Sequence, residues 1–361
     1  MPKRVVVALV TLVLLLVLAA GGLLAWRWLD TSDYEQAVAT MPASTLRASY
    51  TDWAQVRREL DASGVHAGSS GAEVDDFLDA AYRADLTSTS AVYGSTAVLA
   101  HRYGFSPLGA SWEMFGQSRE GAVVAMRLPE SADFPGIERH LRTLGYDAPA
   151  EGAGSGQVWQ GSVDLVAQID ASLTPVFQNI VVLEDERLVL LSDSAAYASS
   201  SAEVARGDAD SLASGDAAED LAGVADEPVS AVLWGADFAC EDLSMAAADD
   251  EDQSLADQLV DEAGGVNPLS GLVMARQPDH SLVVGMRFED SDQAEANLRP
   301  RAELASGEAV GQGGMFPDRF RIASAKTTGA SVVLHLEPTG DPAESTLLSD
   351  LSHGPVLFAT C

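Results

Sequence analysis

The chain has 361 residues, 47% of them apolar, so it is long enough for two domains or one large one and too apolar for wholesale disorder. Acidic residues number 54 and basic residues 21, which gives a formal charge of −33. A surface this negative repels nucleic acid and anionic lipid headgroups and excludes them as main partners. Two cysteines cannot form a zinc cage or an iron–sulfur site, and no cofactor is expected.

The N-terminal segment is predicted to cross a membrane. Residues 5–26 contain no charged side chain, and a helix of that length reaches about 33 Å, enough for a hydrocarbon core about 30 Å thick. Lys3 and Arg4 precede this segment, and Asp30 and Asp33 follow it. Because positive charge favours the cytoplasmic side, the N-terminus is expected in the cytoplasm and the bulk of the chain outside it.

The sequence therefore predicts a cytoplasmic tip at residues 1–4, a transmembrane anchor at 5–28 and a polar stalk at 29–43. The alternative is a cleaved secretory signal, whose apolar region is usually about 7–15 residues long. Both interpretations place the bulk in an extracytoplasmic compartment, and the first makes the chain a single-pass protein of the cell membrane. The negative charge then serves solubility, or it attracts cations or a basic partner.

A first α+β module is predicted over residues 44–206. It opens with a strand at 44–50 and a short helix that Asp52 caps and that carries Trp53. A longer helix is expected at 73–83, where apolar residues recur at i, i+3, i+4 and i+7. Two hairpins, each followed by a helix, complete the module, and their expected strands are 110–116, 122–128, 176–183 and 187–192.

An acidic linker is predicted at residues 207–227, which are rich in acidic and small side chains. A second module over 228–361 repeats the order of the first, with helices between its strands. These strands are expected at 228–234, 271–276, 281–288, 319–325 and 331–337, with a final one directly before Cys361.

Local sequence supports a duplication, because GAVVAMRL at 121–128 is echoed by SLVVGMRF at 281–288. The same order of hairpin and helix also arises by convergence, and that alternative stays open. The implied fold class is α+β: an N-terminal transmembrane helix followed by a duplicated module of antiparallel hairpins, with covering helices on one face.

Cys240 and Cys361 are the only cysteines, and both lie on the predicted oxidising side. An even count in that setting favours one disulfide, and two buried free thiols are the alternative. The bridge would close a loop of about 120 residues and pin the last predicted strand beside an earlier one.

Four acidic residues occupy the spacing of positions 1, 3, 9 and 12 of a calcium-binding loop: Asp208, Asp210, Asp216 and Glu219. Positions 5 and 6 hold Leu212 and Ala213, where such a loop needs an oxygen ligand and a glycine. A solvated acidic linker explains the segment better, so these four residues are weak candidates for metal ligands.

Trp53 and Trp234 are weak candidates for ligand binding, because they occupy corresponding places in the two predicted modules, with Asp52 and Asp237 nearby. Core packing and helix capping are the alternative to a cleft lined by these rings. The six histidines lack metal-binding spacing, and the sequence contains no nucleophile elbow or P-loop. No catalytic residue is predicted.

Several features together resemble a known type of protein. They are the basic tip with one span, MPASTLRASYTDWAQVR at 41–57, GPVLFATC at 354–361, and the scarcity of lysine, found only at Lys3 and Lys326. The chain resembles the uncharacterised, membrane-tethered exported proteins of high-GC Gram-positive bacteria. The resemblance implies an envelope location, and it carries no catalytic residues to transfer.

The sequence thus favours a membrane-anchored extracytoplasmic module that binds a small ligand or an envelope protein. The alternatives are an assembly component of a cell-envelope complex and, with less support, an extracytoplasmic hydrolase, which would need converging Ser, His and Asp side chains.

Overall fold

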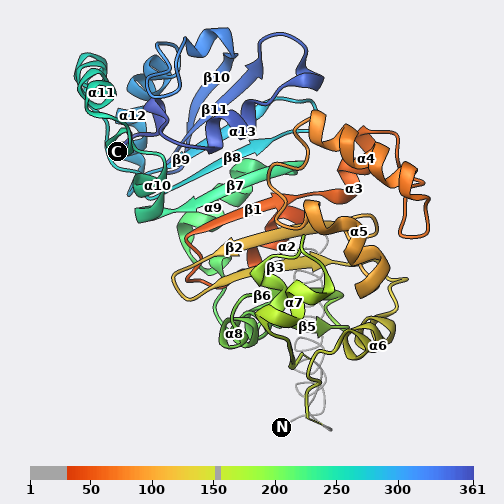
Figure 1. Ribbon diagram of the computed structural model, residues 1–361. Helices are drawn as coiled ribbons and strands as arrows, with labels where there is room; N and C mark the ends of the chain where they lie inside the picture. The colour runs from red at the N-terminus through yellow and green to blue at the C-terminus, as the bar shows by residue number, and fades with distance from the viewer. Residues whose placement is uncertain (1–30, 151–155) are drawn as a thin grey trace, which may run out of the picture.

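The computed structural model describes residues 31–150 and 156–361, and it arranges them around one large sheet (Figure 1). The 11 strands of these residues pair antiparallel in the order β10-β11-β9-β8-β7-β1-β2-β3-β6-β5-β4. Their bounds are β1 Arg47–Thr51, β2 Trp112–Gln117, β3 Ala122–Arg127, β4 Val158–Gln160, β5 Asn179–Leu183, β6 Leu188–Ser192, β7 Ser230–Gly235, β8 Gly271–Arg276, β9 Leu282–Arg287, β10 Phe320–Thr328 and β11 Ser331–Pro338.

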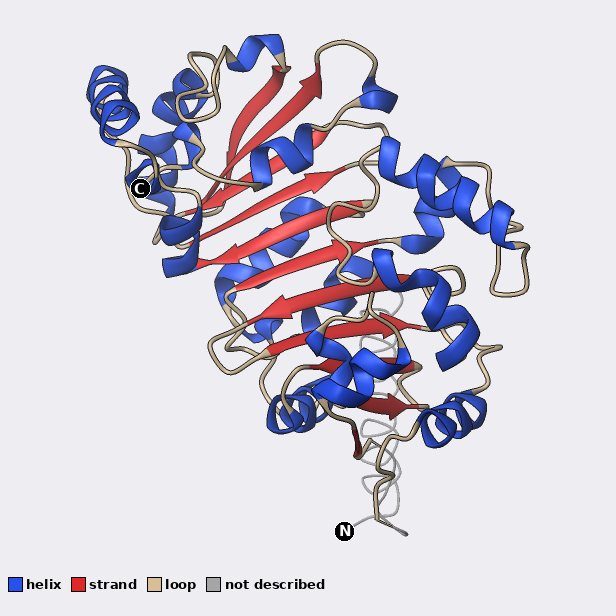
Figure 2. Ribbon diagram, in the orientation of Figure 1, coloured by secondary structure: helices blue, strands red, loops and turns tan. Residues whose placement is uncertain are grey.

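Helices lie on both faces of this sheet (Figure 2). The α-helices are α2 Asp33–Ala39, α3 Trp53–Glu59, α4 Gly71–Arg83, α5 Thr96–Val98, α6 Phe134–Leu144, α7 Val163–Ile169, α8 Ala195–Ala205, α9 Asp216–Ala225, α10 Ala236–Asp242, α11 Asp250–Ala263, α12 Ser291–Leu304 and α13 Leu347–Ser352. Two short 3-10 helices matter below, η4 at Leu212–Ser214 and η8 at Leu357–Ala359.

Strands β1 and β7 pair at the centre of the sheet, with Ser49 opposite Val232. The strand order is the same on either side of this pair, β1-β2-β3-β6-β5 on one side and β7-β8-β9-β11-β10 on the other. The first half of the chain and the second half therefore share one continuous ladder of backbone hydrogen bonds, joined at β1 and β7.

Both faces of the sheet are apolar, because both are covered. On β3, Val123 and Ala125 belong to one core while Val124 and Met126 belong to another. Helices α2, α8 and α9 cover the face that we call the back face, and one core runs under them across both halves. The front face carries two separate cores, one for each half of the chain. A strand covered on both sides needs apolar residues at every position, which explains the weak alternation in the sequence.

The predicted fold class is wrong. In the described ranges no helix is long and apolar enough to cross a membrane, and the predicted anchor at 5–28 lies outside those ranges. The antiparallel hairpins with helices are present, but they build one sheet covered on both faces, whereas covering helices were expected on one face. The single sheet results from the β1–β7 pairing, which joins strands far apart in sequence and leaves no local signal, and the second covered face results from α2, α8 and α9.

Two segments expected to be irregular are helical. Helix α2 lies within the predicted stalk, where Ser32 and Glu35 form a capping box and Tyr34 and Val38 are buried. Helix α9 lies within the predicted acidic linker and buries Leu221 among small apolar side chains. The many acidic residues of this segment hid the narrow apolar stripe of α9. That stripe stabilises a helix only because it packs against the back face of the sheet.

The hairpins were predicted more accurately, because strand alternation and turn residues are local signals. The pair expected at 110–128 is β2 and β3, and the pair expected at 271–288 is β8 and β9. The last predicted strand is instead the 3-10 helix η8, which packs Phe358 into the front core of the second half.

Candidate functional site

A row of buried polar side chains crosses the middle of the front face. Glu113 on β2, Thr51 on β1, Ser230 on β7 and Arg276 on β8 are adjacent in the strand register. Each is at most 4% exposed. This row separates the two front-face cores.

Arg276 forms a buried ion pair between the halves. Its Nη1 lies 3.1 Å from Glu59 Oε2, and the two side chains are only 5% and 11% exposed. Its Nη2 lies 2.7 Å from His280 Nδ1. Arginine has no acceptor, so His280 accepts this hydrogen bond on Nδ1 and is neutral in this arrangement. The network couples the end of α3 to the β8–β9 hairpin.

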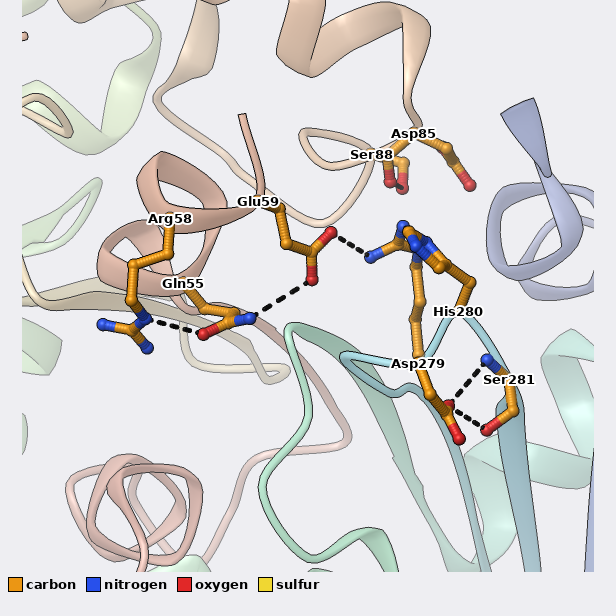
Figure 3. Close-up of polar contacts among 9 residues, drawn as sticks. Gln55, Arg58, Glu59, Asp85, Ser88, Asp279, His280 and Ser281 are labelled. Atoms are coloured by element: carbon orange, nitrogen blue, oxygen red, sulfur yellow. Dashed lines mark hydrogen bonds and ion pairs between the residues drawn. The ribbon is translucent and has the colours of Figure 1, made fainter. Parts of the chain in front are cut away.

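Asp85 completes this group, which we call the central polar cluster (Glu59, Asp85, Arg276 and His280). Figure 3 shows Glu59, Asp85 and His280 gathered from the two halves. The Asp85 carboxylate accepts a hydrogen bond from the Ser349 amide of α13 at 3.2 Å. Burial raises the pKa of Asp85; hydrogen bonds with Ser88 and Ser349 and, to a smaller extent, the Arg276 charge offset part of that rise. Two segments of the first half are thus held to two of the second.

The central polar cluster connects the two halves through buried polar contacts. Arg276 is paired on one side with a carboxylate and on the other with a neutral imidazole, so its donors are turned toward protein groups. Removing one partner of a buried ion pair leaves an uncompensated charge and costs about 3–5 kcal/mol. We therefore assign the central polar cluster to holding the halves together.

Trp53 is buried beside the polar row. Its Nε1 donates to Glu113 Oε2 at 2.9 Å, and the same carboxylate accepts from Ser90 Oγ and the Ala91 amide, each at 2.7 Å. Burial raises the pKa of Glu113, and these hydrogen bonds oppose the rise. Asp52 caps α3 as predicted, because its Oδ1 accepts from the Gln55 amide at 2.7 Å.

Trp234 lies in the other front core, on a strand instead of a helix. Its Nε1 donates to Asp242 Oδ2 at 2.7 Å, and the Arg47 guanidinium lies 5.6 Å from its ring centroid. Both tryptophans are fully buried and belong to different cores, so the structure does not bring them to one cleft. Trp234 does contribute to the wall of a groove of about 510 Å³ near Gly235 and Gly271. Ligand binding by either ring stays a prediction.

The four acidic candidates for metal binding do not converge. Asp208 pairs with Arg206 at 3.3 Å, and Asp210 accepts from the Ala43 amide through its backbone carbonyl. Asp216 and Glu219 lie in the first turn of α9. Throughout 31–150 and 156–361, no group of three or more His, Cys, Asp or Glu side chains could hold a metal ion. The helical turn η4 and α9 occupy the stretch that a calcium loop would need.

The predicted disulfide is present. Cys240 of α10 and Cys361 are bonded, with their Cα atoms 5.5 Å apart and 121 positions apart in sequence. The bridge fixes the chain end against α10, beside the hydrogen bond from the Met245 amide to Thr360 Oγ1 at 3.0 Å. The buried Arg301 guanidinium also donates to the Phe358 carbonyl at 2.9 Å.

Two large grooves open on the back face, one in each half. The acidic groove, of about 790 Å³, lies between α9, the β8–β9 hairpin and strands β10 and β11. Val283 and Val333 line it together with acidic side chains and Lys326. His335 is also in its wall, where burial and then the Lys326 charge lower the histidine pKa.

The arginine groove, of about 690 Å³, lies between α2, the end of β3, the β5–β6 hairpin and the end of α8. Three arginines line it, one from each of the last three elements: Arg127, Arg187 and Arg206. Arginine presents several fixed donors to carboxylate or phosphate oxygens, so this groove has the chemistry to bind an anion.

Sequence reasoning did not single out these arginines. They are up to 79 positions apart (206 − 127), so their grouping depends on β3 and β6 pairing and on where α8 ends. The visible signal was the echo between residues 121–128 and 281–288, which places Arg127 and Arg287 at matching strand ends. The echo said nothing about their partners.

Comparisons with known proteins do not assign a family or a function to this chain. No protein-family model matches the chain, and no curated protein matches it in sequence. A solved structure titled "Structure of crystal form I of TP0453" is similar at a TM-score of 0.38 and 8% identity, over 90% of this chain and 98% of that chain. At this TM-score the likeness carries no argument. The resemblance to exported proteins of high-GC Gram-positive bacteria stays a prediction.

Proposed function

We propose that this protein is an extracytoplasmic binding module, whose ligand lies in a groove on the back face of its sheet. The observation that carries the proposal is the pair of large grooves with charged walls, one in each half. Their volumes fall in the range of about 300–1,000 Å³ that small-molecule sites occupy. The central polar cluster keeps the two halves in register, so both grooves are held on a rigid frame.

The disulfide supports the extracytoplasmic location. Bonds such as Cys240–Cys361 form and persist in oxidising compartments and are rare where glutathione and thioredoxin keep thiols reduced. The charge of −33 fits a protein that stays soluble and apart from anionic surfaces.

An assembly role through strand addition has less support than ligand binding, because both edges of the sheet have features that disfavour pairing with another strand. The outer strand β10 carries a register shift between Ile322 and Ser324 and an exposed charge at Lys326. The opposite edge strand, β4, has only three residues. Bulges, edge lysines and very short edge strands all discourage pairing with another chain.

Hydrolysis has less support than binding. Among the hydrogen bonds between described side chains, the serine–histidine contact is Ser352 Oγ to His353 Nδ1, at 3.3 Å. That Nδ1 also lies 2.7 Å from the Ser349 carbonyl oxygen, to which it donates. A nitrogen that carries a proton cannot accept one from the serine, so this pair is not an activated nucleophile.

The location is tested by trapping thiols in living cells of the source organism. Cells are treated with acid, and unfolded protein is then labelled with a large maleimide before and after reduction. We expect Cys240 and Cys361 to be labelled only after reduction. Two free thiols in freshly trapped cells would contradict the extracytoplasmic location.

Binding is tested on the full chain purified from cells of the source organism. Native mass spectrometry is expected to detect a bound small molecule that is lost on denaturation. The ligand should protect groove residues such as Asp226 or Arg187 from carboxyl- or arginine-directed labelling. A ligand-free protein whose grooves label identically before and after incubation with the cell extract would contradict the binding function.

A further inference from the structure

The arginine groove concentrates positive charge in a chain that has little of it. Arg127, Arg187 and Arg206 come from β3, the β5–β6 hairpin and the residue after α8, and all three reach the same hollow. The whole chain has 21 basic residues against 54 acidic ones. The lining also holds three acidic residues, Glu35, Asp185 and Glu186, so the groove is richer in positive charge than the rest of the chain without being positive overall.

Arg127 is the distinctive member of the group. No carboxylate oxygen of the described residues lies within 4.0 Å of its guanidinium, so it forms no ion pair there. Burial, followed by the Arg187 charge, lowers the pKa of Arg127, while Asp33 opposes this from a distance. A half-buried guanidinium next to a like charge is destabilising unless something compensates it.

The matching arginine of the second half shows what compensation looks like. Arg287 ends β9 as Arg127 ends β3, and both side chains lie toward the back face. Arg287 Nε lies 2.9 Å from Asp220 of α9. Helix α2 offers Arg127 no such partner. The first half thus keeps its strand-end arginine available.

The other two arginines are held by exposed acids. Arg187 lies 3.2 Å from Glu130, whose side chain is 89% exposed, and Arg206 lies 3.3 Å from Asp208, which is 66% exposed. Exposed ion pairs contribute at most about 1 kcal/mol, so a ligand oxyanion can replace either acid.

Arg187 also has a strained backbone. Its φ is +55°, a left-handed conformation that glycine would adopt more readily, and its amide closes the turn onto the Glu184 carbonyl at 3.0 Å. Such strain concentrates at functional positions. Here it places a guanidinium at the groove wall, where glycine would leave none.

Acidic groups in the wall define the remaining space. Glu35 is engaged at the start of α2, where its Oε2 accepts from the Ser32 amide at 2.9 Å. Asp185 and Glu186 lie on the hairpin turn, and the apolar lining includes Ala39, Leu188 and Val204. A ligand in this groove needs an anionic group for the arginines and an uncharged part for the apolar wall.

We infer that the arginine groove binds an organic anion whose phosphate or carboxylate group is held by Arg127, Arg187 and Arg206. The volume of about 690 Å³ has room for such a group and for an organic remainder. This rests on the proposed binding function and names the ligand class for one of the two grooves.

The experiment is isothermal titration calorimetry of the full chain in neutral detergent with three probes. Succinate tests a carboxylate, glycerol 3-phosphate tests a free phosphate ester, and dihexanoyl-phosphatidylglycerol tests a lipid headgroup. We expect at least one probe to bind saturably, and R127Q to weaken that binding about tenfold or more, because a charge-assisted bidentate contact is lost.

The control variant is R119Q, which removes the same charge from an exposed side chain that is 3.9 Å from Glu241. It should bind within about twofold of wild type, since only long-range charge changes. Binding of the lipid alone, sensitive to R127Q, would support the groove and assign the headgroup as its source. Failure of all three probes, or equal binding by R127Q and wild type, would overturn the inference.

The result is separable from the proposed function. A bound molecule found on the native protein, together with no anion binding at Arg127, would reject the arginine groove and leave the binding module intact. A circular dichroism spectrum and melting temperature of R127Q that match wild type establish that any loss belongs to the groove and not to folding.

Discussion

Arg127 and Arg287 occupy the same position in the two halves of the sheet and have different environments. Arg287 is neutralised by Asp220 at 2.9 Å, whereas Arg127 lines a groove together with Arg187, whose like charge acts on it. The second half also contains the disulfide, which closes the chain end onto α10. Two halves with the same strand order can therefore differ in role. The second half uses its strand-end arginine and its disulfide for stability, and the first half leaves its strand-end arginine exposed to a groove.

The largest expected effect comes from the bond that only the second half has. Replacing both cysteines with serine, C240S with C361S, should lower the free energy of unfolding by about 4–5 kcal/mol, because the disulfide closes a loop of 121 residues in the unfolded chain. Urea unfolding followed by tryptophan fluorescence measures it. Trp53, Trp112 and Trp159 report the first half and Trp234 reports the second.

We expect a single transition at lower urea, because the β1–β7 pairing makes the halves one cooperative sheet. Two separate transitions, with the unfolding midpoint of the first half unchanged, would show that the halves unfold independently. That result would contradict the view that they form one cooperative sheet.

The next effect concerns the central polar cluster, which connects the halves. R276M should lower the free energy of unfolding by about 3 kcal/mol, because it leaves the buried Glu59 carboxylate without its ion-pair partner. The matched control is R58M, whose guanidinium is 59% exposed and 3.9 Å from Asp52; its expected loss is below about 1 kcal/mol. The double variant R276M with E59L should recover part of the lost stability. Equal losses of stability in R276M and R58M would contradict the role of the central polar cluster in holding the halves together.

A third effect compares the two indole–carboxylate contacts. E113Q places an amide opposite the donors of Trp53 and Ser90 and should cost about 2 kcal/mol at pH 4.5, whereas D242N, at the more exposed partner of Trp234, should cost below about 1 kcal/mol. Chemical denaturation of both variants and wild type measures the difference.

The cost of E113Q should depend on pH. Burial raises the folded pKa of Glu113 above its ordinary value of 4.5, so the folded state binds this proton more strongly than the unfolded state. That stabilisation is complete below the unfolded pKa and is lost as pH rises through the folded pKa. The difference between wild type and E113Q should therefore shrink from pH 4.5 to pH 7.5; a difference that grows would show that the carboxylate is stabilised as the anion.

The smallest effect tests the two strand-end arginines directly. R287Q should lose about 1 kcal/mol, because Asp220 is left without its partner. R127Q should change stability by less than about 0.5 kcal/mol, or raise it, because the charge it removes has no ion pair among residues 31–150 and 156–361 and is repelled by Arg187. Thermal unfolding at low salt measures both, and a loss in R127Q equal to that in R287Q would mean that Arg127 has a structural partner.

Local signals account for what was predictable in the fold. The helix expected at 73–83 is α4, with a capping box formed by Ser70 and Glu73, and the hairpin strands follow runs of β-branched residues and their turns. Asp52 was recognised as a cap because capping depends on neighbours within three residues. The candidate sites were not predictable in this way, since Arg276 and Glu59 are 217 positions apart.

By itself, the sequence determined the charge of the surface, the positions of most hairpins and the two cysteines available for a bridge. Only the tertiary structure decided that both halves share one sheet, that α9 is a helix over the back face, and that Arg287 is neutralised while Arg127 is not. The physical reason is range. Propensity, capping and turn formation act between near neighbours, whereas burial and ion pairing depend on which distant segments pack together.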